Sequence, residues 1–183
     1  MSAKNVMKLG LAVLFVSGLA LAPALAEATC DGTLTLATGD FSTSPGATCG
    51  GNYTNTHVSD DSSQCLVETL SGGVSHLTHV WEFESVPAGT QYLIWEGHRP
   101  ANSDGDNFKF SSAWIDPNPE EGIQYVLFSG AVINSGFEPV GGFKTLMATS
   151  DDTYEWYVYL KDTAGGTINN PVYIDYLAIC TED

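Results

Sequence analysis

Basic residues are scarce in this sequence, and their scarcity narrows the range of partners. Only 6 lysines and arginines stand against 22 aspartates and glutamates, which gives a formal net charge of −16 at pH 7. A chain this acidic repels the phosphates of nucleic acids and anionic lipid headgroups, whereas it is compatible with divalent cations. We therefore expect no nucleic-acid partner. For most of the acids the simpler explanation is that they keep the protein soluble.

Long apolar runs are missing from all but the start of the chain. Lys4 and Lys8 precede an uninterrupted apolar run over residues 9–21, and the small-residue sequence Ala24-Leu25-Ala26 follows. A basic start, an apolar run and an Ala-x-Ala site in this order are typical of a secretory signal peptide. We expect residues 1–26 to be removed, which leaves a charge of 4 − 22 = −18. The expected product is secreted, extracellular or periplasmic, without membrane insertion.

Motifs of hydrolytic catalysis are also missing. No serine lies in a Gly-x-Ser-x-Gly setting, and no free cysteine is expected to act as a nucleophile. A glycoside hydrolase needs only a pair of carboxylates, whose spacing is spatial and cannot be read from the sequence. We therefore expect a protein that is not an enzyme. Glu82, Glu84 and Glu96 are the first candidates if this expectation is wrong.

The cysteines number four, and none of them forms a Cys-x-x-Cys pair. A zinc site would need such closely spaced ligands, and an even count in an exported protein indicates disulfides instead. Three pairings are open. We favour Cys49 with Cys65, which closes a short loop, and Cys30 with Cys180, which ties the two ends of the mature chain together.

Helical periodicity is absent beyond the apolar start, and short alternating runs separated by turn residues replace it. Such spacing predicts an all-β antiparallel β-sandwich, or jelly roll, in a single domain over residues 27–183. Residues 27–73 contain one short strand at 33–37 and otherwise look irregular, and residues 74–180 form the predicted core. The predicted core strands are 79–83, 92–96, 108–114, 123–128, 143–148, 154–160 and 172–179.

The strand at 154–160 shows how the two faces divide. Alternation places Trp156 and Val158 on one face and Tyr157 and Tyr159 on the other. The first face belongs in the core. The two tyrosines form either a platform for a flat ligand ring or the inner surface of a second sheet layer.

Several stretches of residues 74–180 resemble a known type of module. They are Trp81-Glu-Phe-Glu-Ser-Val-Pro-Ala-Gly, Glu96-Gly-His-Arg, Asn102-Ser-Asp-Gly-Asp-Asn-Phe, Asp152-Thr-Tyr and Val172-Tyr-Ile-Asp-Tyr-Leu-Ala-Ile. Together they are similar to galactose-binding-like jelly-roll domains and to the carbohydrate-binding modules of secreted bacterial proteins. The resemblance implies a non-catalytic carbohydrate-binding domain, often stabilised by calcium. Such modules usually accompany an enzyme domain, which this chain does not contain.

The candidate ligand-binding residues are aromatic rings for stacking and polar groups for sugar hydroxyls. The rings are Trp95, Trp114, Tyr157 and Tyr159, and the polar groups are Glu96, His98, Arg99, Asn102 and Asp104. Arg99 has an alternative role as the ion-pair partner of Asp104 or Asp106.

Calcium is the expected cofactor, because the loop from Asn102 to Asn107 offers carboxylate and amide oxygens at alternating positions. Asp104 and Asp106 are its main candidate ligands, and Asp162 and Asp175 complete the set if the fold brings them near. Alternatively, the loop aspartates only make turn hydrogen bonds. The alternative function is a structural or adhesive surface protein that binds a protein partner instead of a glycan.

Overall fold

The computed structural model describes residues 29–100, 107–115, 123–126, 132–133 and 142–183. Their regular elements are strands and one short 3-10 helix. The elements are β1 (Thr33–Leu36), β2 (Gly39–Thr43), β3 (Ala47–Gly50), η1 (Tyr53–Thr56), β4 (Gln64–Val67), β5 (Thr69–Ser71), β6 (Val74–His76), β7 (Thr78–Val86), β8 (Gly89–His98), β9 (Phe108–Ile115), β10 (Ile123–Val126), β11 (Val132–Ile133), β12 (Phe143–Ser150), β13 (Tyr154–Asp162) and β14 (Pro171–Glu182).

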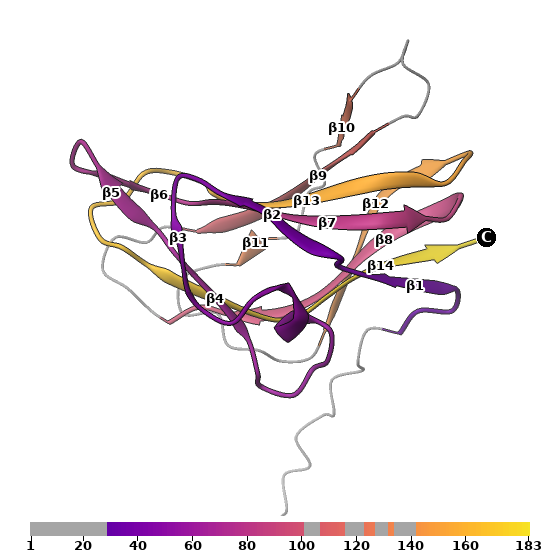
Figure 1. Cartoon of the computed structure of the whole chain (residues 1–183), viewed down its shortest axis with the longest axis horizontal. Coiled ribbons are helices and arrows are strands. Elements are labelled where there is room, and N and C mark those ends of the chain that lie inside the picture. Colours follow the sequence, from indigo (N-terminus) through magenta and orange to yellow (C-terminus); the bar gives the residue numbers. More distant parts are fainter. Residues whose placement is uncertain (1–28, 101–106, 116–122, 127–131, 134–141) are drawn as a thin grey trace, which may run out of the picture.

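Twelve of the strands form two six-stranded antiparallel sheets, and β5 and β6 form a separate two-stranded hairpin. Sheet A has the order β12-β8-β14-β4-β3, with β1 also paired to β14, and sheet B has the order β10-β9-β13-β7-β2, with β11 also paired to β9. Figure 1 shows the two layers, with β13 and β7 running above β14 and β4. The predicted antiparallel β-sandwich is therefore confirmed. Within the described residues, no helix is long and apolar enough to cross a lipid bilayer.

The core lies between the sheets and is rich in aromatic rings. Trp81, Trp95 and Trp156 are fully buried and belong to one hydrophobic cluster. The ring of Trp95 stacks on Phe143 with centroids 4.6 Å apart. The indole N–H of Trp81 donates to Oε1 of Gln64 at 2.7 Å, so the polar atom of this buried ring is satisfied. Each predicted core strand appears within three residues of its expected start, because period-two alternation marks a sheet with one buried face.

The prediction for residues 27–73 is wrong in one respect, because this segment is not largely irregular. Three of its strands beyond β1 join the sandwich: β2 pairs with β7 in sheet B, and β3 and β4 extend sheet A. These strands are four or five residues long, too short for their alternation to stand out among the surrounding Thr, Ser and Gly residues.

Both favoured disulfides are confirmed. Cys30 and Cys180 are joined with their Cα atoms 5.7 Å apart, and Cys49 and Cys65 with theirs 5.0 Å apart. The first ties the start of the described chain to β14, beside which β1 also pairs. The second closes the loop that carries η1, so this loop is held against sheet A at both ends.

Candidate functional site

The predicted ligand residues do not form one site, because neighbouring residues of a strand point to opposite faces. Trp95 is 1% exposed and packs in the core, so its prediction as an exposed stacking ring is wrong. Arg99 is fully buried, with its guanidinium carbon 4.8 Å from the centroid of the Phe108 ring. Its prediction as a ligand contact is therefore also wrong. Asn102, Asp104 and Asp106 lie outside the described residues.

Glu96 and His98 lie on the outer face of sheet A. Oγ of Ser59 donates to Oε2 of Glu96 at 2.5 Å, and the ring of His98 stacks on Tyr173 with centroids 4.6 Å apart. Glu96 lines a pocket of about 470 Å³, together with Ser59, Val58 and other residues of the loop that follows η1. The pocket is therefore on the outer face of sheet A, on the opposite side of the sandwich from Tyr157 and Tyr159.

Tyr157 and Tyr159 lie on the outer face of sheet B, away from the core formed by Trp156 and Val158. Of the two interpretations left open for this pair, a second sheet layer is not found over them among the described residues. Trp114 lies on the core-facing side of β9, where it is half-buried against Trp156 with ring centroids 4.8 Å apart. Trp114 is therefore only partly exposed and does not share a face with Tyr157 and Tyr159.

Phe41 is the aromatic residue that sequence reasoning missed. It is 61% exposed, and its ring meets the Tyr157 ring edge-on with centroids 4.9 Å apart. Tyr157 is consequently only 9% exposed, so its prediction as a freely exposed ring needs correction. Phe41 and the half-buried Tyr159 are the accessible rings of this surface. We call the surface made by Phe41, Tyr157 and Tyr159 the aromatic face.

A β-bulge presents Phe41. The pairing register of β2 and β7 shifts between Asp40 and Ser42, so Phe41 is the extra residue of β2. Bulges re-aim side chains and are common beside binding sites. The sequence signal was weak, because a single phenylalanine within a Gly-, Asp- and Ser-rich stretch does not reveal which strand it joins.

The carboxylate of Asp40 anchors this bulge. Its Oδ1 accepts hydrogen bonds from Nε2 of His79 at 3.1 Å and from Nε2 of Gln64 at 2.9 Å. Its Oδ2 accepts from the backbone N–H of Tyr53 at 3.1 Å. Since Nε2 of His79 must carry a proton to donate, Nδ1 accepts from the hydroxyl of Thr43 at 2.6 Å in the neutral ring. The network joins β2, β7, β4 and η1 across both sheets.

Hydrogen bonding sets the charge state of Asp40. Burial by itself raises the pKa of a carboxyl group, but the bonds from His79, Gln64 and Tyr53 outweigh burial at this position. The net pKa of Asp40 is therefore lowered below its ordinary value. The group stays ionised at neutral pH and keeps its three donors.

Two carboxylates lie at one end of the aromatic face. The hydroxyl of Tyr157 donates to Oε1 of Glu155 and reaches Oε1 of Glu82 at 3.4 Å. Burial and the neighbouring Glu155 carboxylate raise the pKa of Glu82. Burial and the same carboxylates also raise the pKa of Tyr157, so its hydroxyl remains a donor. Glu82 and Glu155 thus offer hydrogen-bond acceptors to sugar hydroxyls next to the exposed rings.

The two predicted calcium ligands among the described residues lie in different sheets and have different surroundings. Asp162, at the end of β13, accepts hydrogen bonds from Nδ1 of His76 at 2.9 Å and from the backbone N–H of Leu77 at 3.0 Å. Its oxygens are engaged by protein donors. The predicted metal set that includes Asp162 is thus not assembled in the described part of the chain.

Asp175 is different, because one of its oxygens is buried without a partner. It is the bulged residue of β14 and is 5% exposed, and within the described residues its Oδ1 has no hydrogen-bond partner. Burial raises the pKa of Asp175, and the nearby carboxylates of Glu96, Asp61 and Asp60 raise it further, against a lowering hydrogen bond from the Asp61 backbone.

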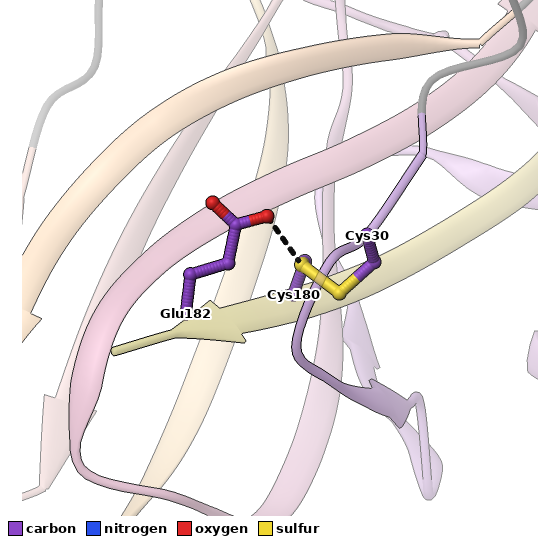
Figure 2. Close-up of side chains that lie close together, drawn as sticks. All are labelled: Cys30, Cys180 and Glu182. Carbon is purple, nitrogen blue, oxygen red and sulfur yellow. Dashed lines mark hydrogen bonds between the residues drawn. A yellow bond between two sulfur atoms is a disulfide. The ribbon is translucent and has the colours of Figure 1, made fainter.

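A third group of potential metal ligands does not hold an ion. Sγ of Cys30, Sγ of Cys180 and a carboxylate oxygen of Glu182 lie within 4.8 Å of one another. Figure 2 shows the three side chains close together. Both sulfur atoms belong to the disulfide, so neither is a thiolate that could bind a metal. The same carboxylate of Glu182 also pairs with Nζ of Lys144 at 2.5 Å.

Comparison with known proteins gives similarity in shape only. No family model matches the chain, and no curated protein matches it. One similar solved structure is the enzymatically active domain of bacteriophage CBA120 tailspike protein 4, with 13% identity and a TM-score of 0.45 over 82% of this chain and 19% of that chain. This chain thus spans about a fifth of that structure.

Carbohydrate-binding modules, which residues 74–180 resemble, are among the similar structures. TmCBM61 in complex with beta-1,4-galactotriose has 10% identity and a TM-score of 0.44 over 77% of this chain and 86% of that chain. The N-terminal cellulose-binding domain of Cellulomonas fimi beta-1,4-glucanase C has 14% identity and a TM-score of 0.46 over 66% of this chain and 79% of that chain. The galactotriose and the cellulose are ligands of those two proteins.

Proposed function

We propose that the chain is an exported, non-catalytic sugar-binding domain whose binding surface is the aromatic face. The observation that carries the proposal is the position of Phe41, a large ring that is 61% exposed and held there by a bulge and the Asp40 network. An exposed aromatic ring flanked by a few polar groups is the usual composition of a sugar-binding surface. Tyr159, Glu82 and Glu155 supply the second ring and the acceptors.

Export is supported by the two disulfides, because such bonds persist in oxidising compartments. The segment predicted as a signal peptide lies outside the described residues. The expected location remains extracellular or periplasmic.

The binding experiment is affinity electrophoresis and calorimetry of the mature protein with a panel of soluble neutral and acidic polysaccharides. Phe41→Ala and Tyr159→Ala should each weaken retention by the bound polysaccharide at least tenfold. Tyr92→Ala is the matched control, since Tyr92 is a half-buried ring on the outer face of sheet A. Equal retention of all three variants, or no polysaccharide bound by the wild type, would refute the proposal.

Catalysis is tested on the same samples. A non-catalytic domain releases no new reducing ends from the polysaccharide that it binds. Release that disappears in the Glu82→Gln variant would instead favour the glycoside hydrolase alternative, because Glu82 and Glu155 are the carboxylates beside the rings.

Calcium is proposed as a stabilising ion bound at Asp175. The buried Oδ1, which has no partner among the described residues, fits a hard cation, and the carboxylates of Glu96, Asp61 and Asp60 add negative charge nearby. Chelation should lower the melting temperature of the wild type, because loss of a bound ion removes its stabilisation by mass action. The Asp175→Asn variant should show no such shift, and the Asp162→Asn control should keep it. If Asp175→Asn keeps the shift and Asp104→Asn or Asp106→Asn loses it, the ion belongs to the 102–107 loop.

The alternative function as an adhesive protein draws on a different surface. Leu70 and Val74 are 49% and 39% exposed on the β5–β6 hairpin, a position suited to contacts with a protein partner. A Leu70→Ser variant that loses cell-surface attachment while Tyr159→Ala keeps it would favour this function.

A further inference from the structure

The placement of the cations is the least expected feature of the aromatic face. The described residues contain four basic side chains of the lysine and arginine type, and each can be accounted for in turn. Arg99 is buried in the core, and Lys144 pairs with Glu182 on the other sheet. The remaining two, Lys109 and Lys161, both belong to sheet B.

Lys109 and Lys161 lie directly opposite each other in the pairing of β9 with β13. Both alternate with core residues of their strands, so they share the outer face of sheet B with Tyr159. Like charges at directly opposite positions on one face of a sheet are destabilising. Among the described residues, neither lysine has a carboxylate oxygen within 4.0 Å.

Two opposed lysines lower the stability of the sheet, although the chain has 22 acidic residues that could have served as partners. The Lys161 ammonium group lies over the Tyr159 ring, 5.0 Å from its centroid. Lys109 and Lys161 therefore form one end of the aromatic face, next to the rings proposed to bind sugar. The carboxylates of Glu82 and Glu155 lie toward the other end, about 13 Å away for the four-residue step from Tyr157 to Lys161.

We infer that the glycan recognised by the aromatic face carries an isolated carboxylate or sulfate group, which Lys109 and Lys161 bind while neutral sugar units lie over Tyr159 and Phe41. This inference rests on the proposed function and specifies its ligand. The acidic end of the same face disfavours a uniformly charged polyuronate, because further anionic groups would meet Glu82 and Glu155. The ligand class is thus a largely neutral polysaccharide with occasional acidic substituents.

The test compares each acidic glycan with its neutralised form. Glucuronoxylan and carboxyl-reduced glucuronoxylan probe a carboxylate, and a sparsely sulfated agarose and its desulfated form probe a sulfate. The wild type should bind the charged member of one pair about tenfold more tightly than its neutralised form, as expected for one charge-assisted hydrogen bond. Added salt should reduce this preference, because Lys161 is exposed to solvent and Lys109 is partly exposed.

Lys161→Gln and Lys109→Gln should each remove most of the preference while leaving binding of the neutralised glycan unchanged. Lys144→Gln is the matched control, since it removes the same charge from sheet A and should keep the wild-type preference. Thermal midpoints of the Lys109 and Lys161 variants should be equal to or slightly above that of the wild type, because each change removes one of two directly opposed like charges.

Equal binding of charged and neutralised glycans, or an unchanged preference in Lys161→Gln and Lys109→Gln, would overturn the inference and leave the proposed function standing. If the wild type retains no glycan, charged or neutral, both the proposed function and the inference fall. A preference for the carboxylate pair or for the sulfate pair identifies which anionic group the lysines receive.

Discussion

Replacing Asp40 is the sharpest test of how the fold supports the aromatic face. The Asp40→Ala change removes the acceptor of three hydrogen bonds, two of which come from the fully buried side chains of His79 and Gln64. A buried donor left without a partner costs about 1–3 kcal/mol. Two such donors would cost about 2–6 kcal/mol, and since contacts in one network are not additive we expect about 3 kcal/mol. The loss of the bond from the backbone N–H of Tyr53 adds little to this cost, because this exposed N–H can donate to water instead.

The Asp40→Asn variant isolates the charge from the size of the side chain. It keeps an acceptor oxygen and should cost about 1 kcal/mol at neutral pH. The wild-type side chain is 26% exposed, so solvent screens part of the charge-assisted hydrogen bond that its carboxylate accepts from His79.

The pH dependence has a definite sign. The folded-state pKa of Asp40 is lowered, so its contribution to stability is fully present above its unfolded-state pKa and is lost as pH falls through the folded-state value. The stability gap between wild type and Asp40→Asn should thus be constant from pH 7 down to about pH 5 and should shrink below about pH 4. The Asp40→Asn variant has no carboxyl group at this position, so its stability does not change with the protonation of residue 40.

Urea unfolding curves at several pH values measure these differences. The Asp40→Ala variant should also bind glycan more weakly, because the bulge that presents Phe41 loses its anchor. A free energy of unfolding for Asp40→Ala within 0.5 kcal/mol of the wild type, below the about 1 kcal/mol expected of one lost buried bond, would refute the role of the network. So would a wild-type to Asp40→Asn gap that stays the same at pH 7 and pH 3.

Two further predictions concern the core and the loop that carries η1. Trp95→Ala should cost about 3–5 kcal/mol, because it empties a fully packed position, and chemical unfolding should show this loss with binding per folded molecule unchanged; an effect below about 1 kcal/mol would mean that the ring is not core. Replacing both Cys49 and Cys65 by serine should cost about 3 kcal/mol for a crosslink of this loop length, as measured by thermal melting under oxidising conditions. An unchanged melting temperature would show that the loop is ordered without its crosslink.

The sequence determined the sheet architecture because its signal is local. Alternation along each of the longer strands marked a buried and an exposed face, so β13 could be divided correctly into Trp156 inside and Tyr159 outside. The spacing of the cysteines likewise favoured the two disulfides that formed. Trp95 and Glu96 were nevertheless predicted in one site, which the same alternation contradicts, since adjacent strand residues face opposite ways.

Only the tertiary structure decided which distant segments meet. Nothing local in the Gly39–Thr43 stretch shows that it pairs with β7, and that pairing alone brings Phe41 onto Tyr157. The opposition of Lys109 and Lys161 depends in the same way on the register of β9 against β13. Which strands pair is decided by backbone hydrogen bonds between segments far apart in the sequence, and neither strand by itself reveals its partner. The fold class was therefore readable from the chain, whereas the surface proposed to bind sugar was created by pairing.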